Sequence, residues 1–152
     1  MKFVFKIFRR LCWTYNQKKI RVLLNNKTIS VFGSPDITFE NKIKIGENCS
    51  INHQAYLNGM GGIVIGNNVS ISAGVKMIST GLDVNVIEKK HVNKEIVIED
   101  NVWIGAGAII LSGVTIKKNS VIAAGAVVNK DIGEGEIWVG VPAKLLRKRC
   151  IG

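Results

Sequence analysis

The sequence predicts an all-β solenoid built from six-residue repeats, with one projecting loop and two basic ends. Three observations lead to this fold class. Aliphatic residues recur every six positions, one long segment interrupts that period, and positive charge is concentrated at the two ends of the chain. The 152 residues, 47% of them hydrophobic and 21% charged, are sufficient for a folded domain with a core of its own.

The six-residue period extends through most of the chain. A helix has a period of 3.6 residues and a strand a period of 2, so neither explains a repeat of six. A solenoid explains it, because each hexapeptide then forms a short strand and a turn, and three hexapeptides complete one triangular coil. The aliphatic residues expected to point inward are Phe39, Ile45, Ile51, Leu57, Ile65, Ile71, Met77, Ile98, Ile104, Ile110, Ile116, Ile122 and Val128.

The interruption and the basic ends divide the chain into three parts. We expect residues 1–38 to form a basic segment that caps the open end of the solenoid. Residues 39–141 should form the β-helix, with a loop at 79–95 that projects from it, and residues 142–152 a basic tail or helix. A break of this length inside a compact fold is typical of a functional loop.

Residues 1–30 hold eight Lys or Arg and no acid, and they mix apolar and basic residues at partly helical spacing. Besides the capping role, this pattern is typical of a segment that makes a peripheral contact with an anionic membrane. No nucleic-acid recognition motif accompanies the basic ends, so no nucleic-acid partner is expected.

The N-terminal apolar run is interrupted by Lys6, Arg9 and Arg10, which leaves neither a signal-peptide core nor a membrane span. The three cysteines lie far apart, without the spacing of a metal site. We therefore expect a cytoplasmic protein with reduced thiols, peripheral at the inner face of the membrane if residues 1–30 bind it, and no metal.

The segment "IVIEDNVWIGAGAIILSGVTIKKNSVIAAGAVVNKDI", followed by "VGVPAKLLRK", resembles the hexapeptide-repeat acyltransferases. Within them the chain is most similar to the maltose/galactoside O-acetyltransferase-like group and its polysaccharide-modifying relatives, over about residues 39–148. The resemblance implies a left-handed parallel β-helix and a homotrimer, with acetyl-CoA in the groove between neighbouring subunits. It implies acetyl transfer to a sugar hydroxyl in capsule, O-antigen or exopolysaccharide synthesis. N-acetylation of an amino sugar, or a catalytically degenerate trimeric binding protein, are the alternatives.

The family carries its catalytic histidine in the projecting loop, but here the matching position is Leu82. A sugar hydroxyl needs a base to accept its proton during attack on a thioester, and imidazole is suited to this at neutral pH. His91, near the end of the loop, is the first candidate; a solvated histidine in a basic loop is its ordinary interpretation. His53 is the second candidate. Asp83 acting alone, or no catalysis at all, is the remaining interpretation.

Further site residues follow from the chemistry of acetyl transfer and from the same resemblance. The resemblance implies that Asn52 lines the acceptor pocket and takes part in catalysis by holding the reacting groups, and Asp83 is also expected at the acceptor. The N–H groups of Gly105 and Ala106, in the glycine-rich coil, are expected to donate to the thioester oxyanion. Trp103 is expected to pack against the pantetheine arm, the acceptor sugar or a neighbouring subunit. The residues expected to accommodate the coenzyme are Ala124, which leaves room for the pantetheine arm, and Lys130, Lys144 and Arg147, which match basic positions that contact CoA.

Overall fold

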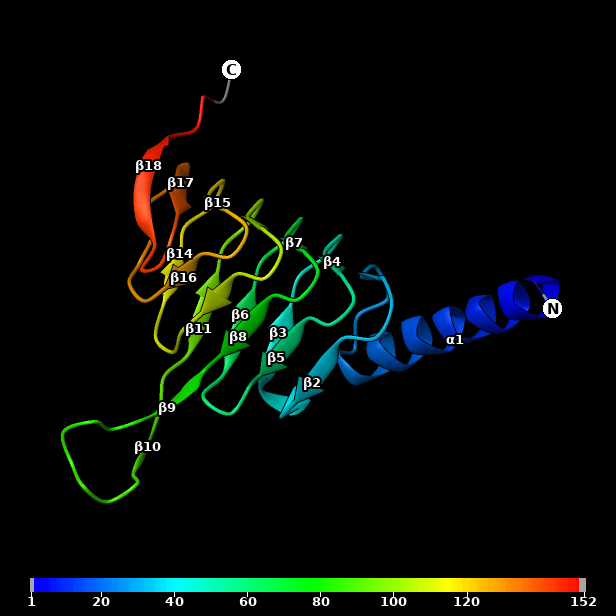
Figure 1. The fold of residues 1–152 in the computed structure, drawn as a ribbon, viewed down its shortest axis with the longest axis horizontal. Coiled ribbons are helices and arrows are strands. Elements are labelled where there is room, and N and C mark those ends of the chain that lie inside the picture. The colour runs from blue at the N-terminus through cyan, green and yellow to red at the C-terminus, as the bar shows by residue number, and fades with distance from the viewer. Residues whose placement is uncertain (1, 151–152) are drawn as a thin grey trace.

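The computed structural model describes residues 2–150, except for the side chains of residues 2, 3, 5–10 and 13. The chain forms a solenoid of parallel strands, with a helix projecting from its N-terminal end and a narrow arm from one side (Figure 1). It is a left-handed parallel β-helix of about 5 turns, which confirms the predicted fold class. Within the described residues, no helix combines the length and the apolarity needed to cross a lipid bilayer.

Three sheets form the sides of the solenoid. The seven-stranded sheet contains β1 (Ser30–Val31), β4 (Ser50–Ile51), β7 (Ser70–Ile71), β12 (Trp103–Ile104), β15 (Val121–Ile122), β17 (Glu136–Val139) and β18 (Lys144–Lys148). The five-stranded sheet contains β2 (Asp36–Thr38), β5 (Tyr56–Asn58), β8 (Lys76–Ile78), β13 (Ile109–Ile110) and β16 (Val127–Val128). The four-stranded sheet contains β3 (Ile43–Ile45), β6 (Ile63–Ile65), β11 (Ile96–Ile98) and β14 (Thr115–Ile116).

The chain turns at three corners in each coil. The first corner joins the seven-stranded to the five-stranded sheet, the second joins the five-stranded to the four-stranded sheet, and the third leads back to the seven-stranded sheet. Strand pairing shows the coil lengths: Trp103 pairs with Val121, 18 residues later, and Ser50 with Ser70, 20 residues later. Ser70 pairs with Trp103, 33 residues later, because that coil contains the arm.

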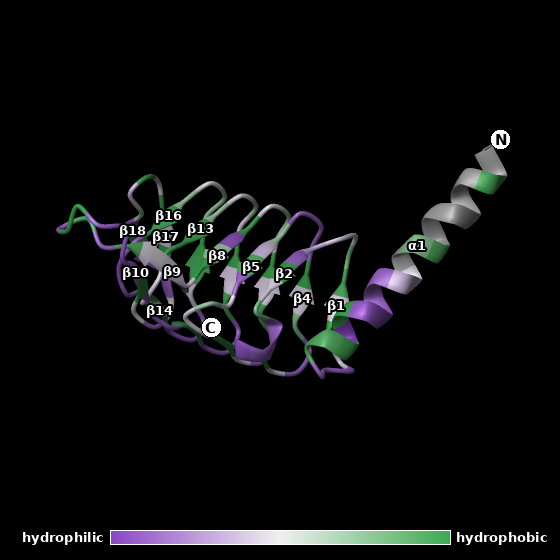
Figure 2. Cartoon of the chain, turned by 90° about the horizontal axis from the view of Figure 1, so that it is seen from below, coloured by the Kyte–Doolittle hydropathy of each residue, from purple (hydrophilic) through white to green (hydrophobic). Residues whose placement is uncertain are grey.

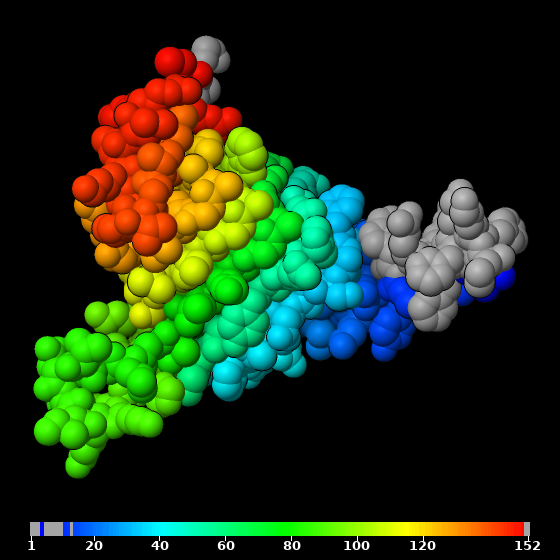
Figure 3. Space-filling model, viewed as in Figure 1, coloured from blue at the N-terminus to red at the C-terminus, as the bar shows by residue number. Residues whose placement is uncertain are grey.

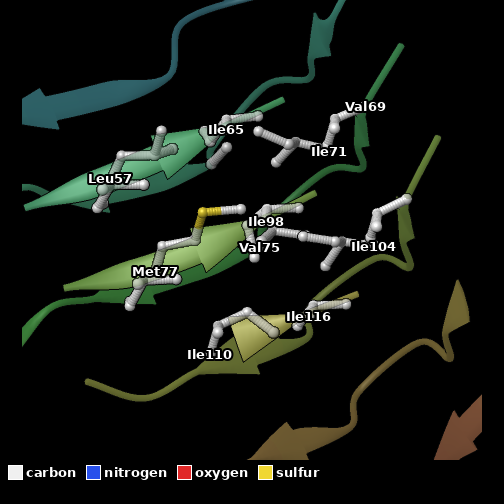
Figure 4. Close-up of a cluster of buried hydrophobic side chains, with 14 of the residues drawn as sticks. Leu57, Ile65, Val69, Ile71, Val75, Met77, Ile98, Ile104, Ile110 and Ile116 are labelled. Carbon is white, nitrogen blue, oxygen red and sulfur yellow. The ribbon is translucent and has the colours of Figure 1, made fainter. Parts of the chain in front are cut away.

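The core is a continuous column of the predicted aliphatic residues. Figure 4 shows side chains such as Leu57, Met77 and Ile110 pointing from successive strands into the interior. Every predicted inward position from Ile51 to Val128 is buried, and Ile45 is partly buried. The six-residue period therefore reflects burial: each side of a coil is one hexapeptide, which places one large apolar residue inside and a smaller buried residue four positions later, as in Ile104 and Ala108.

Phe39 was expected to point inward, and this prediction is wrong. Its side chain is exposed and its backbone is left-handed, with φ 56°, immediately before the 3-10 turn η1 (Glu40–Lys42). The 20-residue coils place two extra residues at the second corner, so the inward series passes from Ile37 to Ile45, eight residues later, as it does from their strand partners Leu57 to Ile65.

The N-terminal part differs from its predicted boundary at residue 39. The solenoid already begins at Ile29, which is fully buried beside β1. Helix α1 (Lys2–Leu23) caps it through its C-terminal part, where Ile20 and Leu24 enter the core and Asn16 Nδ2 donates a hydrogen bond to Ser34 Oγ at 2.6 Å. Arg21 secures this end, because its Nε donates a hydrogen bond to the carbonyl of Ile29 at 2.9 Å.

The C-terminal segment is a strand rather than the tail or helix expected for residues 142–152. Strand β18 pairs antiparallel with β17 and covers the last edge of the seven-stranded sheet. This pairing satisfies backbone groups that an open edge would expose to water. Figure 3 shows the segment in orange and red at the C-terminal end of the solenoid.

Candidate active site

The predicted loop at 79–95 forms an arm with a two-stranded base. Strand β9 (Thr80–Leu82) pairs antiparallel with β10 (His91–Asn93), and the chain between them projects from the second corner (Figure 1). Ser79 anchors the arm: its fully buried Oγ accepts a hydrogen bond from the Gly61 N–H at 2.8 Å and donates one to the Asn58 carbonyl at 2.7 Å. The arm therefore starts from a fixed point on the solenoid.

His91 lies directly opposite Leu82 in this two-stranded base. The neighbouring pair of Asp83 and Lys90 is hydrogen-bonded, because the Asp83 N–H donates to the Lys90 carbonyl at 2.9 Å, and so is the pair of Ser79 and Lys94, three pairs from Leu82 and His91, through the Lys94 N–H at 3.0 Å. Hydrogen-bonded pairs alternate with non-hydrogen-bonded pairs along an antiparallel ladder. Leu82 and His91 thus form a non-hydrogen-bonded pair, in which the two side chains lie on one face with Cβ atoms about 4.5–5.5 Å apart. Both side chains are exposed.

Asp83 shapes the turn of the arm. Its Oδ1 accepts hydrogen bonds from the Asn85 N–H at 3.0 Å and from Asn85 Nδ2 at 3.2 Å. An aspartate that holds the backbone two residues later is a common device for starting a turn. This contact gives the Asp83 carboxylate a structural task in the arm.

His53 and Asn52 lie at the first corner, on a different edge of the solenoid from the arm. Asn52 is half-buried, and its Nδ2 donates to the Ile71 carbonyl at 3.1 Å. His53 is exposed and packs over Gly33, where an added Cβ would lie 2.5 Å from the His53 Cβ. Glycine at position 33 therefore makes room for the histidine of the next coil.

Ala106 and Ala124 occupy neighbouring coils at this same first corner. Both are exposed, and the Gly125 N–H donates to the Ala106 carbonyl at 2.8 Å. Their small side chains leave a smooth edge along which a thin ligand can lie. Gly105 is different, because its N–H donates to the Ile122 carbonyl at 2.8 Å. That bond occupies the predicted oxyanion donor, so of the two expected groups only the Ala106 N–H keeps this role as a candidate.

Trp103 projects from the outer face of the seven-stranded sheet, with 53% of its surface exposed. Its Nε1 donates to Ser72 Oγ at 3.2 Å, which fixes the ring against the preceding coil. Beside it lies an open groove of about 540 Å³, lined by amide side chains and by Arg149.

The amides of this groove form an asparagine ladder at the third corner, which the sequence analysis did not identify. Asn68 Nδ2 donates to Asn101 Oδ1 at 3.2 Å, and Asn101 Nδ2 donates to Asn119 Oδ1 at 3.3 Å. All three residues have positive φ, which asparagine tolerates better than most residues. The sequence does contain the signal, because an asparagine precedes each of these coils at the same distance from its inward isoleucine.

Lys144 and Arg147 lie on one face of β18 because the strand contains a bulge. Lys144 pairs with Val139 and Arg147 with Ile137, and the register shifts between them. Val139 and Ile137 are two residues apart, so they share the outer face of the sheet, and their partners share it too. A regular strand would have placed two residues three positions apart on opposite faces.

Lys130 lies away from these two cations. It follows β16 at the second corner, and its Nζ stands 5.1 Å from the centre of the Trp138 ring. The ring is buried, and its Nε1 donates to Glu136 Oε2 at 2.8 Å. A lysine over an aromatic face is a stabilising contact, so Lys130 helps to close the C-terminal end of the solenoid.

The predicted site residues thus fall into two groups within one chain. The arm with His91 and Asp83 leaves the second corner, whereas the remaining candidates other than Lys130 lie at the first corner and on the seven-stranded sheet. Among the residues that the structure describes, no group of three or more His, Cys, Asp or Glu side chains is placed to hold a metal ion.

Two family models match the repeats. Residues 95–130 match the bacterial transferase hexapeptide (six repeats), and residues 42–76 match the hexapeptide repeat of succinyl-transferase. Among curated proteins, the chain is 38% identical over 134 residues to the acetyltransferase-type protein YJL218W of Saccharomyces cerevisiae, covering 85% of this chain and 68% of that protein.

Two further relatives are named for different activities. The galactoside O-acetyltransferase of Lactococcus lactis is 36% identical over 130 residues, covering 69% of this chain and 62% of the enzyme. The 2,3,4,5-tetrahydropyridine-2,6-dicarboxylate N-acetyltransferase of Staphylococcus aureus is 39% identical over 83 residues, covering 55% of this chain and 32% of the enzyme. The chain therefore spans less than two thirds of the length of both enzymes.

Solved structures show the same architecture. A hexapeptide-repeat acetyltransferase of Vibrio cholerae complexed with acetyl-CoA has a TM-score of 0.78 and 28% identity, covering 91% of this chain and 83% of that one. A maltose O-acetyltransferase of Clostridium difficile has a TM-score of 0.76 and 27% identity, covering 91% and 86%. The polysialic acid-specific acetyltransferase NeuO has a TM-score of 0.63 and 28% identity, covering 83% and 64%.

The fold, the repeats and these relatives agree, and the chain belongs to the hexapeptide-repeat acetyltransferase family, within its galactoside and maltose O-acetyltransferase-like group.

Proposed function

We propose that this protein transfers an acetyl group from acetyl-CoA to a sugar hydroxyl, with His91 as the general base. The observation that carries the proposal is the pairing of His91 with Leu82. The family's histidine position is occupied by a leucine, and the one histidine of the arm lies across the strand from it, on the same face. An imidazole is thus available within a few ångströms of the expected place.

The chemistry needs one proton acceptor and one anion-stabilising group. As the sugar oxygen attacks the thioester carbonyl, an unprotonated ring nitrogen of His91 accepts the hydroxyl proton. The carbonyl oxygen gains negative charge, for which the Ala106 N–H is the candidate donor. The tetrahedral intermediate then expels the CoA thiolate, which takes the proton from the imidazolium and leaves as the thiol. The products are the acetyl ester and CoA.

A homotrimer would bring the two groups of site residues together. Within one chain the arm and the Ala106–Ala124 edge occupy different corners, so a site that uses both needs a second subunit. The five-stranded sheet supports such a contact, because its outer face carries half-exposed apolar side chains at Ile78, Ile109, Leu111 and Val127. Cyclic trimers use two different surfaces of each subunit, which suits an arm on one corner and a groove at another.

The coenzyme would lie along the first corner and the seven-stranded sheet. The exposed Ala106 and Ala124 leave space for the pantetheine arm, and Lys144 and Arg147 share the outer face at the end of that sheet. Two cations on one face suit the phosphates of CoA, which accept charge-assisted hydrogen bonds. The acetyl-CoA complex of the Vibrio cholerae protein supports this choice of acyl donor.

The likeness to NeuO and to the galactoside enzyme favours a carbohydrate acceptor, such as a precursor of a capsule, O-antigen or exopolysaccharide. The Staphylococcus aureus relative favours a second candidate, N-acetylation of an amine such as an amino sugar. Leu82 favours a third, a trimeric binding protein without catalysis.

One assay separates these functions. Release of free CoA thiol from acetyl-CoA is measured with a panel of neutral sugars, amino sugars and polysaccharides. Thiol release with neutral sugars and an alkali-labile product support O-acetylation. Release only with amino sugars, giving an alkali-stable amide, supports the N-acetyltransferase. Tight acetyl-CoA binding without release on any acceptor supports the binding protein, and a monomer in sedimentation would contradict the shared site.

A further inference from the structure

Helix α1 carries an exposed apolar stripe that the solenoid does not use. Val4, Leu11, Tyr15 and Val22 are 68%, 65%, 67% and 79% exposed. At about 100° per residue, these four positions fall within about 40° of one another around the helix axis. Positions 7 and 8 of the sequence are also apolar and belong to the same spacing. The stripe extends over about 27 Å of the helix, from Val4 to Val22.

The stripe is separate from the contact that holds the helix to the solenoid. That contact uses Ile20, which is 5% exposed and lies about 160° around the helix from Val22. The helix extends away from the first coil (Figure 2). Asn16, whose Nδ2 donates to Ser34 Oγ at 2.6 Å, lies about 40° from Ile20 and belongs to the same capping side. The exposed Val4, Leu11, Tyr15 and Val22 lie on another side of the helix.

The charges around the stripe are all of one sign. Residues 1–30 contain eight Lys or Arg and no acid; the exposed Lys19 flanks the stripe, and the exposed Lys18 falls within its spacing. A bundle of α1 helices from several copies of this chain would bring these charges together without any acidic partner. Coiled coils usually place opposite charges beside their apolar seam, and here Lys18 falls within the seam spacing itself. The charge pattern therefore disfavours a second copy as the occupant of the stripe.

We infer that α1 is an in-plane membrane helix, which binds an anionic lipid bilayer by inserting this stripe at the boundary between headgroups and acyl chains. A basic helix with one apolar side lies in the membrane interface, since its apolar residues leave water while its cations meet acidic headgroups. Nucleic acid would satisfy the cations but offers no apolar phase for Leu11, Tyr15 and Val22. An anionic bilayer offers both an apolar phase for the stripe and acidic headgroups for the cations.

Co-sedimentation of the full chain with lipid vesicles tests this inference. At low salt, the protein should pellet with vesicles of phosphatidylcholine and phosphatidylglycerol and remain in solution with phosphatidylcholine alone. The variant Leu11→Gln/Val22→Gln keeps every charge and changes only exposed residues, and its partition coefficient should fall by about tenfold or more. The control Val141→Gln removes an exposed apolar side chain far from the helix, 71% exposed, and should bind like the parent.

The exposed Cys12 gives a second measurement, which reports insertion directly. In a Cys150→Ser chain, an environment-sensitive fluorophore on Cys12 should shift to shorter emission wavelengths with anionic vesicles. A protein that pellets while its probe keeps the emission seen in water would overturn the inference. Equal pelleting of Leu11→Gln/Val22→Gln and the parent would also overturn the inference, because it would indicate adsorption by charge alone. Release of the protein from vesicles by duplex DNA would then identify a general polyanion site.

Loss of the oligomer in Leu11→Gln/Val22→Gln, measured by sedimentation velocity, would also overturn the inference, because it would assign the stripe to a contact between subunits.

Discussion

His91 is the cross-strand partner of Leu82 at the base of the arm, in a pair whose side chains lie on the same face. Under the proposed function, His91 would supply the base that Leu82 cannot. In an antiparallel pair, the side chains of two directly opposite residues occupy neighbouring space on the same face of the strands. A base lost from one strand can therefore be replaced from the other.

The first prediction concerns this pair. His91→Ala should lower kcat for acetyl transfer by about 10²–10⁴-fold, the usual contribution of a positioned base, with a smaller effect on the Kd for acetyl-CoA. Lys89→Ala, an exposed change in the same arm, is the matched control and should keep kcat. Thiol release under saturating acetyl-CoA measures both.

Leu82→His in the His91→Ala background should recover part of the lost rate, because the new imidazole enters the same face of the pair. Full activity of His91→Ala together with loss in His53→Ala would instead place the base at the first corner. If both single variants keep full activity, neither histidine is the base.

The second prediction uses the bulge in β18. Lys144→Ala and Arg147→Ala should each weaken acetyl-CoA binding by about 1–3 kcal/mol, the loss expected for a charge-assisted phosphate contact. Lys148 is the control, because it pairs with Glu136 and lies on the other face of the strand. Titration calorimetry with acetyl-CoA and with an analogue lacking the 3′-phosphate checks this. Two results would show that Lys144 and Arg147 do not contact the 3′-phosphate. One is an equal loss of binding free energy for acetyl-CoA and for the analogue. The other is a loss in Lys148→Ala as large as in Lys144→Ala and Arg147→Ala.

The inward residues of the solenoid could be predicted from the sequence because burial acts on each hexapeptide alone. Ile51, Ile71 and Ile104 belong to three different coils, yet each is aliphatic at the same place in its hexapeptide and each is buried. The arm could be predicted for the same reason, since a segment without the period has no inward residue to contribute. The error at Phe39 arose where a 3-10 turn absorbs two residues and shifts the series.

Geometry that depends on strand pairing could not be predicted. The partnership of Leu82 with His91 depends on the register of two strands separated by a long turn, and no single residue specifies it. Lys144 and Arg147 lie on the same face because of a bulge, and a bulge leaves no repeating pattern in the sequence from which it could be predicted. The occupied N–H of Gly105 depends on the neighbouring coil, because it donates to Ile122. The expected catalytic and coenzyme-binding roles themselves stay predictions.

The third prediction separates two roles of Lys130. Its ammonium lies over the Trp138 ring, so Lys130→Ala should lower the free energy of unfolding by about 0.5–1 kcal/mol, as measured by urea denaturation. Asn129→Ala, at the neighbouring exposed position, is the control. An unchanged Kd for acetyl-CoA would leave Lys130 with the structural role alone. A rise in Kd like that of Arg147→Ala would support the coenzyme contact expected from the sequence.

The fourth prediction concerns acid stability. The Lys117 ammonium donates to the Glu99 carboxylate at 2.9 Å, and with the Lys118 N–H it lowers the pKa of Glu99. A lowered pKa in the folded state stabilises the fold above the unfolded-state pKa, and the effect is lost as pH falls through the lowered value. The parent should therefore exceed Glu99→Gln in Tm at neutral pH, and the difference should vanish in acid. The pair is on the surface and screened by water, so the difference in Tm should be small. A difference that grows toward low pH would contradict this assignment.

The fifth prediction concerns the anchor of the arm. Ser79 is fully buried, and its Oγ accepts a hydrogen bond from the Gly61 N–H and donates one to the Asn58 carbonyl. Ser79→Ala leaves the partly buried Gly61 N–H without its acceptor and removes one donor from the Asn58 carbonyl, which should lower the free energy of unfolding by about 1 kcal/mol or more. It should also loosen the base of the arm, so that hydrogen exchange at the Asp83 amide, which donates to Lys90, becomes faster. Ser70→Ala removes a hydroxyl from the exposed outer face and should change neither quantity. If Ser79→Ala matches Ser70→Ala in stability and in exchange, the arm is held by the pairing of β9 with β10 alone.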